Sequence, residues 1–160
     1  PRVQHNCQGG VEVSFYENTT LFFRNGTTMI QVAVGIITIN SKVLVCQRKR
    51  TSRYPLKWEF PGGKFENGES VDECLRRELR EELSINAVVG KEFFRQEWIY
   101  SDSGSFEVFY HLVPSYAGTI RNNVFEQIRW FNLSELASVD MLEGNKDAID
   151  LLVKTKSNIK

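Results

Sequence analysis

The chain has 160 residues, 41% of them hydrophobic, which suits a single compact domain with an adequate core. Its 20 basic and 20 acidic side chains balance, so no broad basic surface for a nucleic-acid polymer is indicated. No apolar run approaches membrane-spanning length, and the N-terminus lacks the basic and then apolar layout of a secretory signal. We therefore expect a cytoplasmic protein without a membrane or nucleic-acid partner, and both a monomer and a homodimer remain open.

Two hairpins are predicted in the first part of the chain. The runs VEVSFY (11–16) and TLFFR (20–24) are compatible with an opening hairpin, because both are rich in β-branched and aromatic residues. The runs IQVAVGIITI (30–39) and KVLVCQR (42–48) predict a second hairpin that turns at residues 40–41, Asn-Ser.

The segment KWEFPGGKFENGES (57–70) indicates a short apolar strand followed by a loop rich in glycine and proline. The adjacent glycines Gly62 and Gly63 let the backbone approach a ligand closely and expose its amide and carbonyl groups. The loop leads into a helix, whose N-terminal end favours anions. A strand, a glycine loop and an acidic helix in succession make a place where phosphate and metal can meet.

The segment ESVDECLRRELREEL (69–83) contains no helix breaker, and its leucines recur at helical spacing to form one apolar stripe. Glu78 and Glu82 lie on the flank of this stripe as a like-charge pair four residues apart. Their repulsion is about 0.2–0.5 kcal/mol on an exposed helix and grows where the site is partly desolvated. We therefore expect a positive group beside them.

Two positive partners remain open. The first is arginine on the helix surface, since Arg77 is spaced to pair with Glu73 and with Glu81 on an ordinary solvated face. The second is a hard divalent cation, because magnesium is held by carboxylate oxygens together with substrate phosphates.

The second half of the chain is dominated by strand signals. Strands are predicted within residues 87–101, 105–116 and 126–133, which are rich in β-branched and aromatic side chains. A short helix is expected near Ser134 and a last one over residues 145–153. The chain is thus of the mixed α/β class, without repeats or low-complexity tracts.

The cysteines and histidines suggest no further chemistry. Cys7, Cys46 and Cys74 are odd in number and far apart, without zinc-ligand spacing, so free thiols are the simplest interpretation. His5 and His111 belong to no motif, and no nucleophilic triad can be argued from them.

The glycine loop and the acidic helix together resemble the signature of the Nudix hydrolases, Gly-x5-Glu-x7-Arg-Glu-U-x-Glu-Glu-x-Gly-U, where U is a bulky aliphatic residue. The chain meets this pattern at Gly63, Glu69, Arg77, Glu78, Leu79, Glu81 and Glu82. It departs at Ser84, where the family has a glycine and where a helix end favours a left-handed turn. That glycine carries no reacting group, so the departure bears on local stability more than on chemistry.

The resemblance implies the Nudix α/β/α sandwich with a mixed β-sheet, as one domain over residues 29–160. Residues 1–28 fall outside it, and an added hairpin and a dimer contact are both open for this extension. The implied reaction is attack of water on a phosphorus of a nucleoside diphosphate linked to another group, for which metal ions neutralise phosphoryl charge.

The family pattern also implies a metal site. It would hold Mg²⁺, or alternatively Mn²⁺, through Glu78, Glu81, Glu82 and the carbonyl of Gly62. Relatives often add a carboxylate from outside the signature, and Glu126 is the candidate here, with an ordinary exposed loop acid as the alternative. Either Glu78 or Glu82 would accept the proton of the attacking water.

Two further residues would support this site. Arg77 would hold Glu78 by charge-assisted hydrogen bonds. Glu69 would tie down the loop, although an acid that favours the helix dipole explains it nearly as well.

Similarity to MutT-type enzymes implies a nucleotide site and the release of a nucleoside monophosphate and pyrophosphate from a triphosphate, 8-oxo-dGTP included. Arg48 would lie near the nucleotide, Gly63 and Lys64 would contact it, and Asn145 would contact the base edge. The alternative for Asn145 is a helix N-cap, for which asparagine is a leading residue. Several aromatic side chains in the later strands could stack on a base, although most such residues are core and none is singled out: Phe94, Trp98, Tyr100, Phe106, Phe109 and Tyr110.

Two rival functions remain. One is a Nudix enzyme that acts on ADP-ribose, nucleotide sugars or dinucleoside polyphosphates. The other is a non-catalytic Nudix domain that senses a nucleotide; such domains usually have eroded carboxylates, whereas all three are intact here, so hydrolysis is favoured.

Overall fold

The computed structural model describes residues 6–8, 11–16, 19–24, 27–102 and 104–157, with the side chains of 28–102 and 104–155. In chain order its elements are β1 (Asn6–Gln8), β2 (Val11–Tyr16), β3 (Thr19–Arg24), β4 (Thr27–Ile39), β5 (Lys42–Gln47), β6 (Trp58–Glu59), β7 (Gly62–Lys64), α1 (Val71–Leu83), β8 (Asn86–Val88), β9 (Glu92–Tyr100), β10 (Gly104–Val113), β11 (Ser115–Ala117), β12 (Gln127–Asn132), the 3-10 helices η1 (Leu133–Ser138) and η2 (Glu143–Asn145), and α2 (Lys146–Ser157).

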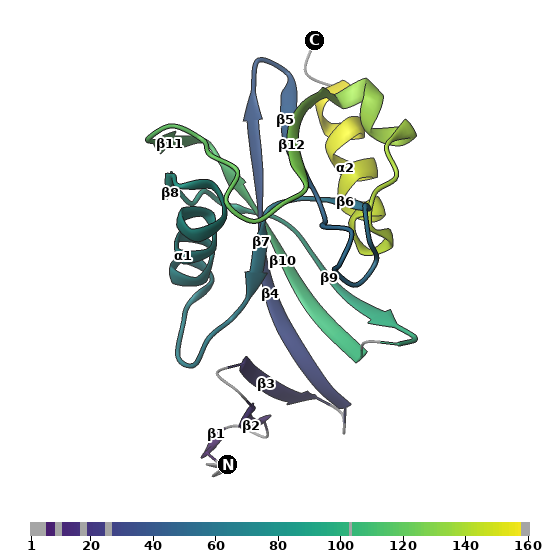
Figure 1. The fold of residues 1–160 in the computed structure, drawn as a ribbon. Coiled ribbons are helices and arrows are strands. Elements are labelled where there is room, and N and C mark those ends of the chain that lie inside the picture. Colours follow the sequence, from purple (N-terminus) through teal and green to yellow (C-terminus); the bar gives the residue numbers. More distant parts are fainter. Residues whose placement is uncertain (1–5, 9–10, 17–18, 25–26, 103, 158–160) are drawn as a thin grey trace.

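Strand β4 organises the main sheet. It pairs in parallel with β10 and antiparallel with β3, β5 and β7, so the sheet is mixed. Its side chains alternate between two cores: Ala33 packs with the leucines of α1, and Val34 packs with the apolar residues of α2. The two α-helices accordingly lie on opposite sides of the central strands (Figure 1). The predicted mixed α/β/α sandwich is therefore confirmed.

Both predicted hairpins are present. Strands β2 and β3 pair antiparallel, and β3 continues the sheet by pairing with β4. The β4–β5 hairpin turns at Asn40 and Ser41, whose φ angles are 49° and 63°. Positive φ at both central residues matches the right-handed twist of the flanking strands, and asparagine tolerates that conformation well.

Helix α1 begins with a reciprocal cap. The Ser70 hydroxyl accepts a hydrogen bond from the Glu73 N–H, and the Glu73 carboxylate accepts one from the Ser70 N–H at 2.9 Å. Glu73 thus caps the helix and does not serve as the surface partner of Arg77 that its spacing suggested. The other pair suggested by spacing, Arg77 with Glu81, is present at 3.6 Å.

The same helix ends at Ser84 in the left-handed conformation, with φ 59° and ψ 29°. A serine therefore occupies the turn that favours glycine, at a conformational cost. The Asn123 side chain stabilises this end by donating to the Ser84 hydroxyl at 2.9 Å and to the Glu81 carbonyl at 2.7 Å.

Some expectations needed correction or lie partly outside the described residues. The segment expected as a loop after residue 60 contains the short strand β7, and the last helix begins at Lys146, after η2. Cys46 and Cys74 are free, as expected, and the structure shows that both are buried, whereas the Cys7 side chain lies outside the described part. Burial raises the pKa of the Cys74 thiol to about 12, so this thiol stays protonated. In the described chain, no helix is long and apolar enough to cross a membrane.

Candidate active site

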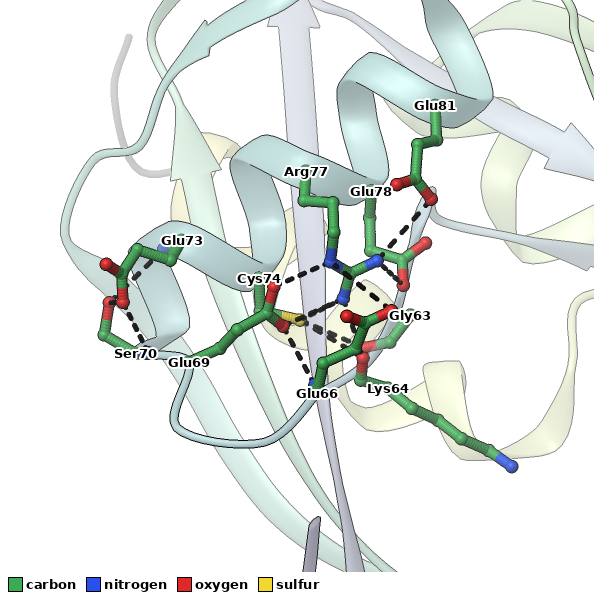
Figure 2. A network of polar contacts seen from close by, with 10 residues as sticks. All are labelled: Gly63, Lys64, Glu66, Glu69, Ser70, Glu73, Cys74, Arg77, Glu78 and Glu81. Carbon is green, nitrogen blue, oxygen red and sulfur yellow. Dashed lines mark hydrogen bonds and ion pairs between the residues drawn. The ribbon is translucent and has the colours of Figure 1, made fainter. Parts of the chain in front are cut away.

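Arg77 is the centre of a network of carboxylates on the loop-facing side of α1 (Figure 2). Its guanidinium donates to both oxygens of Glu69, at 2.7 and 2.9 Å, and to Glu78 at 2.8 Å. It also donates to the Lys64 carbonyl at 3.1 Å. One planar side chain thereby joins the helix to the loop that precedes it, because arginine presents its donors as a rigid fork.

Glu69 binds the loop backbone in addition to pairing with Arg77. One of its oxygens accepts a hydrogen bond from the Glu66 N–H at 2.9 Å. The hydrogen bonds from Arg77 lower the pKa of Glu69, so this carboxylate is ionised at neutral pH. The geometry therefore accounts for Glu69 by loop contacts, beyond any interaction with the helix dipole.

Glu78 and Glu82 are carboxylates withdrawn from water. Burial raises the pKa of both, and for Glu82 the neighbouring charge of Glu78 is the second cause of a large upward shift. The Gly62 N–H donates to Glu82 at 3.0 Å and partly offsets this. Ionising both carboxylates is therefore costly unless a positive group lies beside them.

Two glycines bring the loop against these carboxylates. At Gly63, a Cβ atom would lie 2.3 Å from the Glu78 carboxylate. At Gly62, where φ is 143°, a Cβ would lie 2.1 Å from the Ala33 carbonyl of β4. At Gly62 only glycine fits against the backbone of β4, and at Gly63 the missing side chain leaves room for the Glu78 carboxylate.

This donor set fits a hard divalent cation. Partly buried carboxylate oxygens of like charge, next to the backbone of the glycine loop, match the oxygen ligands that magnesium takes. Glu81 lies on the same helix face but is more exposed. Among the residues that the structure describes, no three acidic, histidine or cysteine side chains already converge as a complete cage.

Glu126 is held by contacts at the end of β5. Its carboxylate pairs with Arg50 at 3.3 Å, and its N–H donates to the Gln47 carbonyl at 2.9 Å. In the described chain, no hydrogen bond or ion pair joins it to the three glutamates of α1. The structure thus anchors Glu126 at the end of β5 and pairs its carboxylate with Arg50, and its role as a metal ligand stays a prediction.

A cavity of about 440 Å³ opens beside the glutamates. All four residues predicted to bind substrate line it: Arg48, Gly63, Lys64 and Asn145. Gly62 and Gly63 belong to both the cavity wall and the glutamate site. The rest of the wall comes from β4, β9, β10 and the segment after residue 141, and includes Val32, Val34, Trp98, Tyr100, Phe106 and Tyr110.

Asn145 is a buried cavity residue. Only 5% of it is exposed, and its side-chain oxygen lies 3.3 Å from the Tyr110 hydroxyl. It stands at the end of η2, immediately before α2. Both the cap and the base-contact interpretations placed it at this junction, and the structure adds that it faces the cavity.

Arg48 is engaged inside the protein. It donates to the Glu59 carboxylate at 2.7 Å and to the Arg53 carbonyl at 2.8 Å. The family resemblance placed the positive charge of Arg48 near the nucleotide. In the structure the Glu59 carboxylate partly neutralises that charge.

Sequence reasoning missed several residues of the cavity. Glu59 was passed over, although a carboxylate within the apolar run KWEF is an unusual signal. Trp98 and Tyr100 were not singled out, although their spacing of two on β9 puts both on one face. The Trp98 indole nitrogen is buried without a hydrogen-bond partner among the described residues. Phe109, by contrast, stacks on Phe65 in the core.

Comparison with known proteins agrees with this site. The family model described as NUDIX domain matches residues 29–152. Over 107 residues the chain is 36% identical to the CTP pyrophosphohydrolase of Escherichia coli K12, which covers 67% of this chain and 78% of that protein. Over 121 residues it is 30% identical to the 8-oxo-dGTP diphosphatase of the same strain, which covers 75% and 93%.

Solved structures show the same likeness. The solution structure of the E. coli ORF135 protein matches with a TM-score of 0.76 at 27% identity, covering 85% of this chain and 96% of that one. A MutT structure from work on Aliivibrio salmonicida and Vibrio cholerae matches with a TM-score of 0.67 at 26% identity, covering 79% and 98%.

The chain therefore belongs to the Nudix family. Within that family it is a pyrophosphohydrolase of the MutT type, as the sequence resemblance had implied.

Proposed function

We propose that this protein is a Mg²⁺-dependent hydrolase that converts a nucleoside triphosphate to the monophosphate and pyrophosphate. The observation that carries the proposal is the shared position of Gly62 and Gly63, which contact the glutamates of α1 and also line the cavity. A nucleoside in the cavity would therefore present its phosphates to the buried carboxylates. Hydrolysis of a nucleotide requires this adjacency of the cavity and the carboxylates, because catalysis of phosphoryl transfer is mainly positioning and charge stabilisation.

Glu78, Glu81, Glu82 and the Gly62 carbonyl are the proposed ligands of Mg²⁺, and Mn²⁺ is the alternative ion. When bound, the cation would neutralise the charge that develops on the phosphoryl oxygens. Glu126 remains a candidate for a further ligand, and its placement beside Arg50 makes it the weakest member of the set.

The proposed reaction uses the protein's own carboxylates for the proton. The oxygen of a water molecule attacks one of the two phosphorus atoms of the α–β anhydride, the bridging P–O bond breaks to release monophosphate and pyrophosphate, and Glu78 or Glu82 accepts the proton of the water. Arg77 is proposed to position Glu78 through the 2.8 Å hydrogen bond, and Glu69 to hold Arg77 in place. Arg48, Gly63, Lys64 and Asn145 are proposed to contact the nucleotide from the cavity wall.

The names of the relatives support CTP and 8-oxo-dGTP as the substrates to test first. Hydrolysis of ADP-ribose, nucleotide sugars or dinucleoside polyphosphates is the alternative within the same chemistry. A purely sensing domain is less favoured, because the carboxylates and their arginine are intact and connected. We also propose that residues 29–160 form the catalytic domain and that residues 1–28 are an added extension of its sheet, supported by the β3–β4 pairing.

The proposal is tested by a product-release assay with Mg²⁺ on CTP, 8-oxo-dGTP, the ordinary triphosphates, ADP-ribose and a nucleotide sugar, with products separated by chromatography. Monophosphate plus pyrophosphate from a triphosphate is the expected result. Turnover of only the diphosphate-linked sugars would overturn the substrate class and keep the mechanism. Nucleotide binding without any turnover would support the sensing domain.

A further inference from the structure

The cavity wall contains a carboxylate that neither the metal site nor the reaction uses. Glu59 lies on β6, paired with Cys46 of β5, and only 19% of its side chain is exposed. One of its oxygens accepts the 2.7 Å hydrogen bond from Arg48. In the described part of the chain, no hydrogen bond reaches the other oxygen. Glu59 lines the cavity and this second oxygen is not a buried atom, so it is free to accept a hydrogen bond from a ligand there.

Glu59 lies between the aromatic wall of the cavity and the acidic helix. Together with Arg48 it acts electrostatically on the hydroxyl of Tyr100, which is part of the aromatic cavity wall. It also acts on Glu82, which places it within reach of the acidic helix. Glu59, Gly62 and Gly63 line the same cavity, so a nucleotide whose phosphates lie at the glycines would bring its nucleoside into the space that this carboxylate faces.

Arg48 prepares the carboxylate to act as an acceptor. Its guanidinium is itself held by the Arg53 carbonyl at 2.8 Å, so the ion pair is fixed from two sides. Burial raises the pKa of Glu59, and both the charge and the hydrogen bond of Arg48 oppose that shift.

We propose that Glu59 is a specificity-determining residue that accepts a hydrogen bond from the exocyclic amino group of the substrate base. This inference rests on the proposed function, since it requires a nucleotide in the cavity. An ionised carboxylate has acceptors only, so it favours an amino group and repels a carbonyl oxygen at the same position. Cytosine would thereby be selected over uracil, and guanine over hypoxanthine.

The test compares kcat/KM for the pairs CTP and UTP, and dGTP and dITP, in the wild type and in Glu59→Gln. The glutamine amide can turn its NH₂ group toward a carbonyl, so UTP turnover should rise in absolute terms. The ratio of CTP to UTP should fall by about tenfold or more, the range expected for a hydrogen bond to a charged group. The ratio of dGTP to dITP should fall in the same direction.

Two further variants separate recognition from folding. Glu59→Asp keeps the negative charge but moves it away from the base, because its side chain is one methylene shorter. The CTP to UTP ratio of kcat/KM should therefore fall without any rise in UTP turnover. Glu92→Gln is the matched control, because it removes a carboxylate from the Arg95 pair at 2.7 Å, and neither residue is among those lining the cavity. That control should leave both ratios unchanged.

If Glu59→Gln lowered kcat/KM for both nucleotides of each pair by the same factor, the inference would be overturned. Glu59 would then serve only in a structural ion pair with Arg48. Binding of CMP and UMP, measured by calorimetry without divalent metal, gives a readout independent of turnover. If no triphosphate is hydrolysed, the proposed function fails, and a CMP preference that disappears in Glu59→Gln would still support the role of Glu59. Equal affinity of the wild type for CMP and UMP would overturn it.

Discussion

Replacement of Gly63 by alanine is the sharpest test of the contact between the loop and the acidic helix. A Cβ at this position would lie 2.3 Å from both Cδ and Oε1 of Glu78, whereas ordinary contacts begin at 3.4 Å. The φ angle of Gly63 is not in the left-handed region, so alanine can adopt the backbone and the clash falls on the carboxylate. Glu78 must then retreat by about 1 Å, against its 2.8 Å hydrogen bond from Arg77.

A displacement of about 1 Å in a catalytic group costs on the order of 100-fold in rate. We therefore expect kcat/KM of Gly63→Ala to fall by about that factor, measured as Mg²⁺-dependent pyrophosphate release from the best triphosphate. The fold should survive, because the clash meets the far end of a flexible side chain, and thermal melting followed by circular dichroism should report a cooperative transition.

Gly68→Ala is the matched control. Gly68 has a φ of 80° and no atom within 4 Å of a built Cβ, so alanine there introduces backbone strain of about 1 kcal/mol without touching Glu78. Its melting temperature should fall while kcat/KM stays within a few-fold of the wild type. Wild-type activity in Gly63→Ala, or an equal loss of activity in Gly68→Ala, would refute the reasoning.

Three further predictions concern helix α1. Ser84→Gly should be more stable than Ser84→Ala by about 1 kcal/mol, or about 2–4 °C in melting temperature, because both lose the hydroxyl and only glycine relieves the left-handed strain; equal stabilities would contradict this. Arg77→Lys should lower kcat by about tenfold or more, because lysine cannot reproduce the two-pronged contact with Glu69, whereas Arg76→Lys on the exposed face should have little effect. Glu82→Gln should abolish Mg²⁺-dependent turnover and the rise of melting temperature with added Mg²⁺. Its metal-free form should stay folded, because one of two neighbouring like charges has been removed. Unfolding of this variant would show that the charge is structural.

Local features of the fold were predictable because their causes lie close together in the sequence. The apolar stripe of α1 follows from leucines at helical spacing, and all three are buried as expected. The turn at Asn40 and Ser41 follows from the conformations those residues tolerate between two strand-forming runs. The end of α1 at Ser84 was also placed correctly, although only the structure showed that serine takes the left-handed turn.

The contacts of the acidic residues were predicted unevenly. The hydrogen bond from Arg77 to Glu78 agrees with what the family pattern implied, whereas the pairing of Arg77 with Glu69 was not predicted. Spacing made Glu73 one possible partner of Arg77, but Glu73 caps the start of the helix, since orphan backbone N–H groups compete for a nearby carboxylate. Glu126 pairs with Arg50 from a distant part of the chain, a partner that no local pattern indicates.

The sequence by itself determined the class of protein and the face of the helix that carries its carboxylates, because both depend on residues within one short segment. Only the tertiary structure decided how the cavity is built, since its walls come from β4, from β9 and β10, and from the segment around Asn145. The partnership of Arg48 with Glu59 likewise arises because two neighbouring strands and their connecting loop converge there. Contacts between different strands and loops are fixed by packing of the whole sheet, and the spacing of residues along the chain does not predict them.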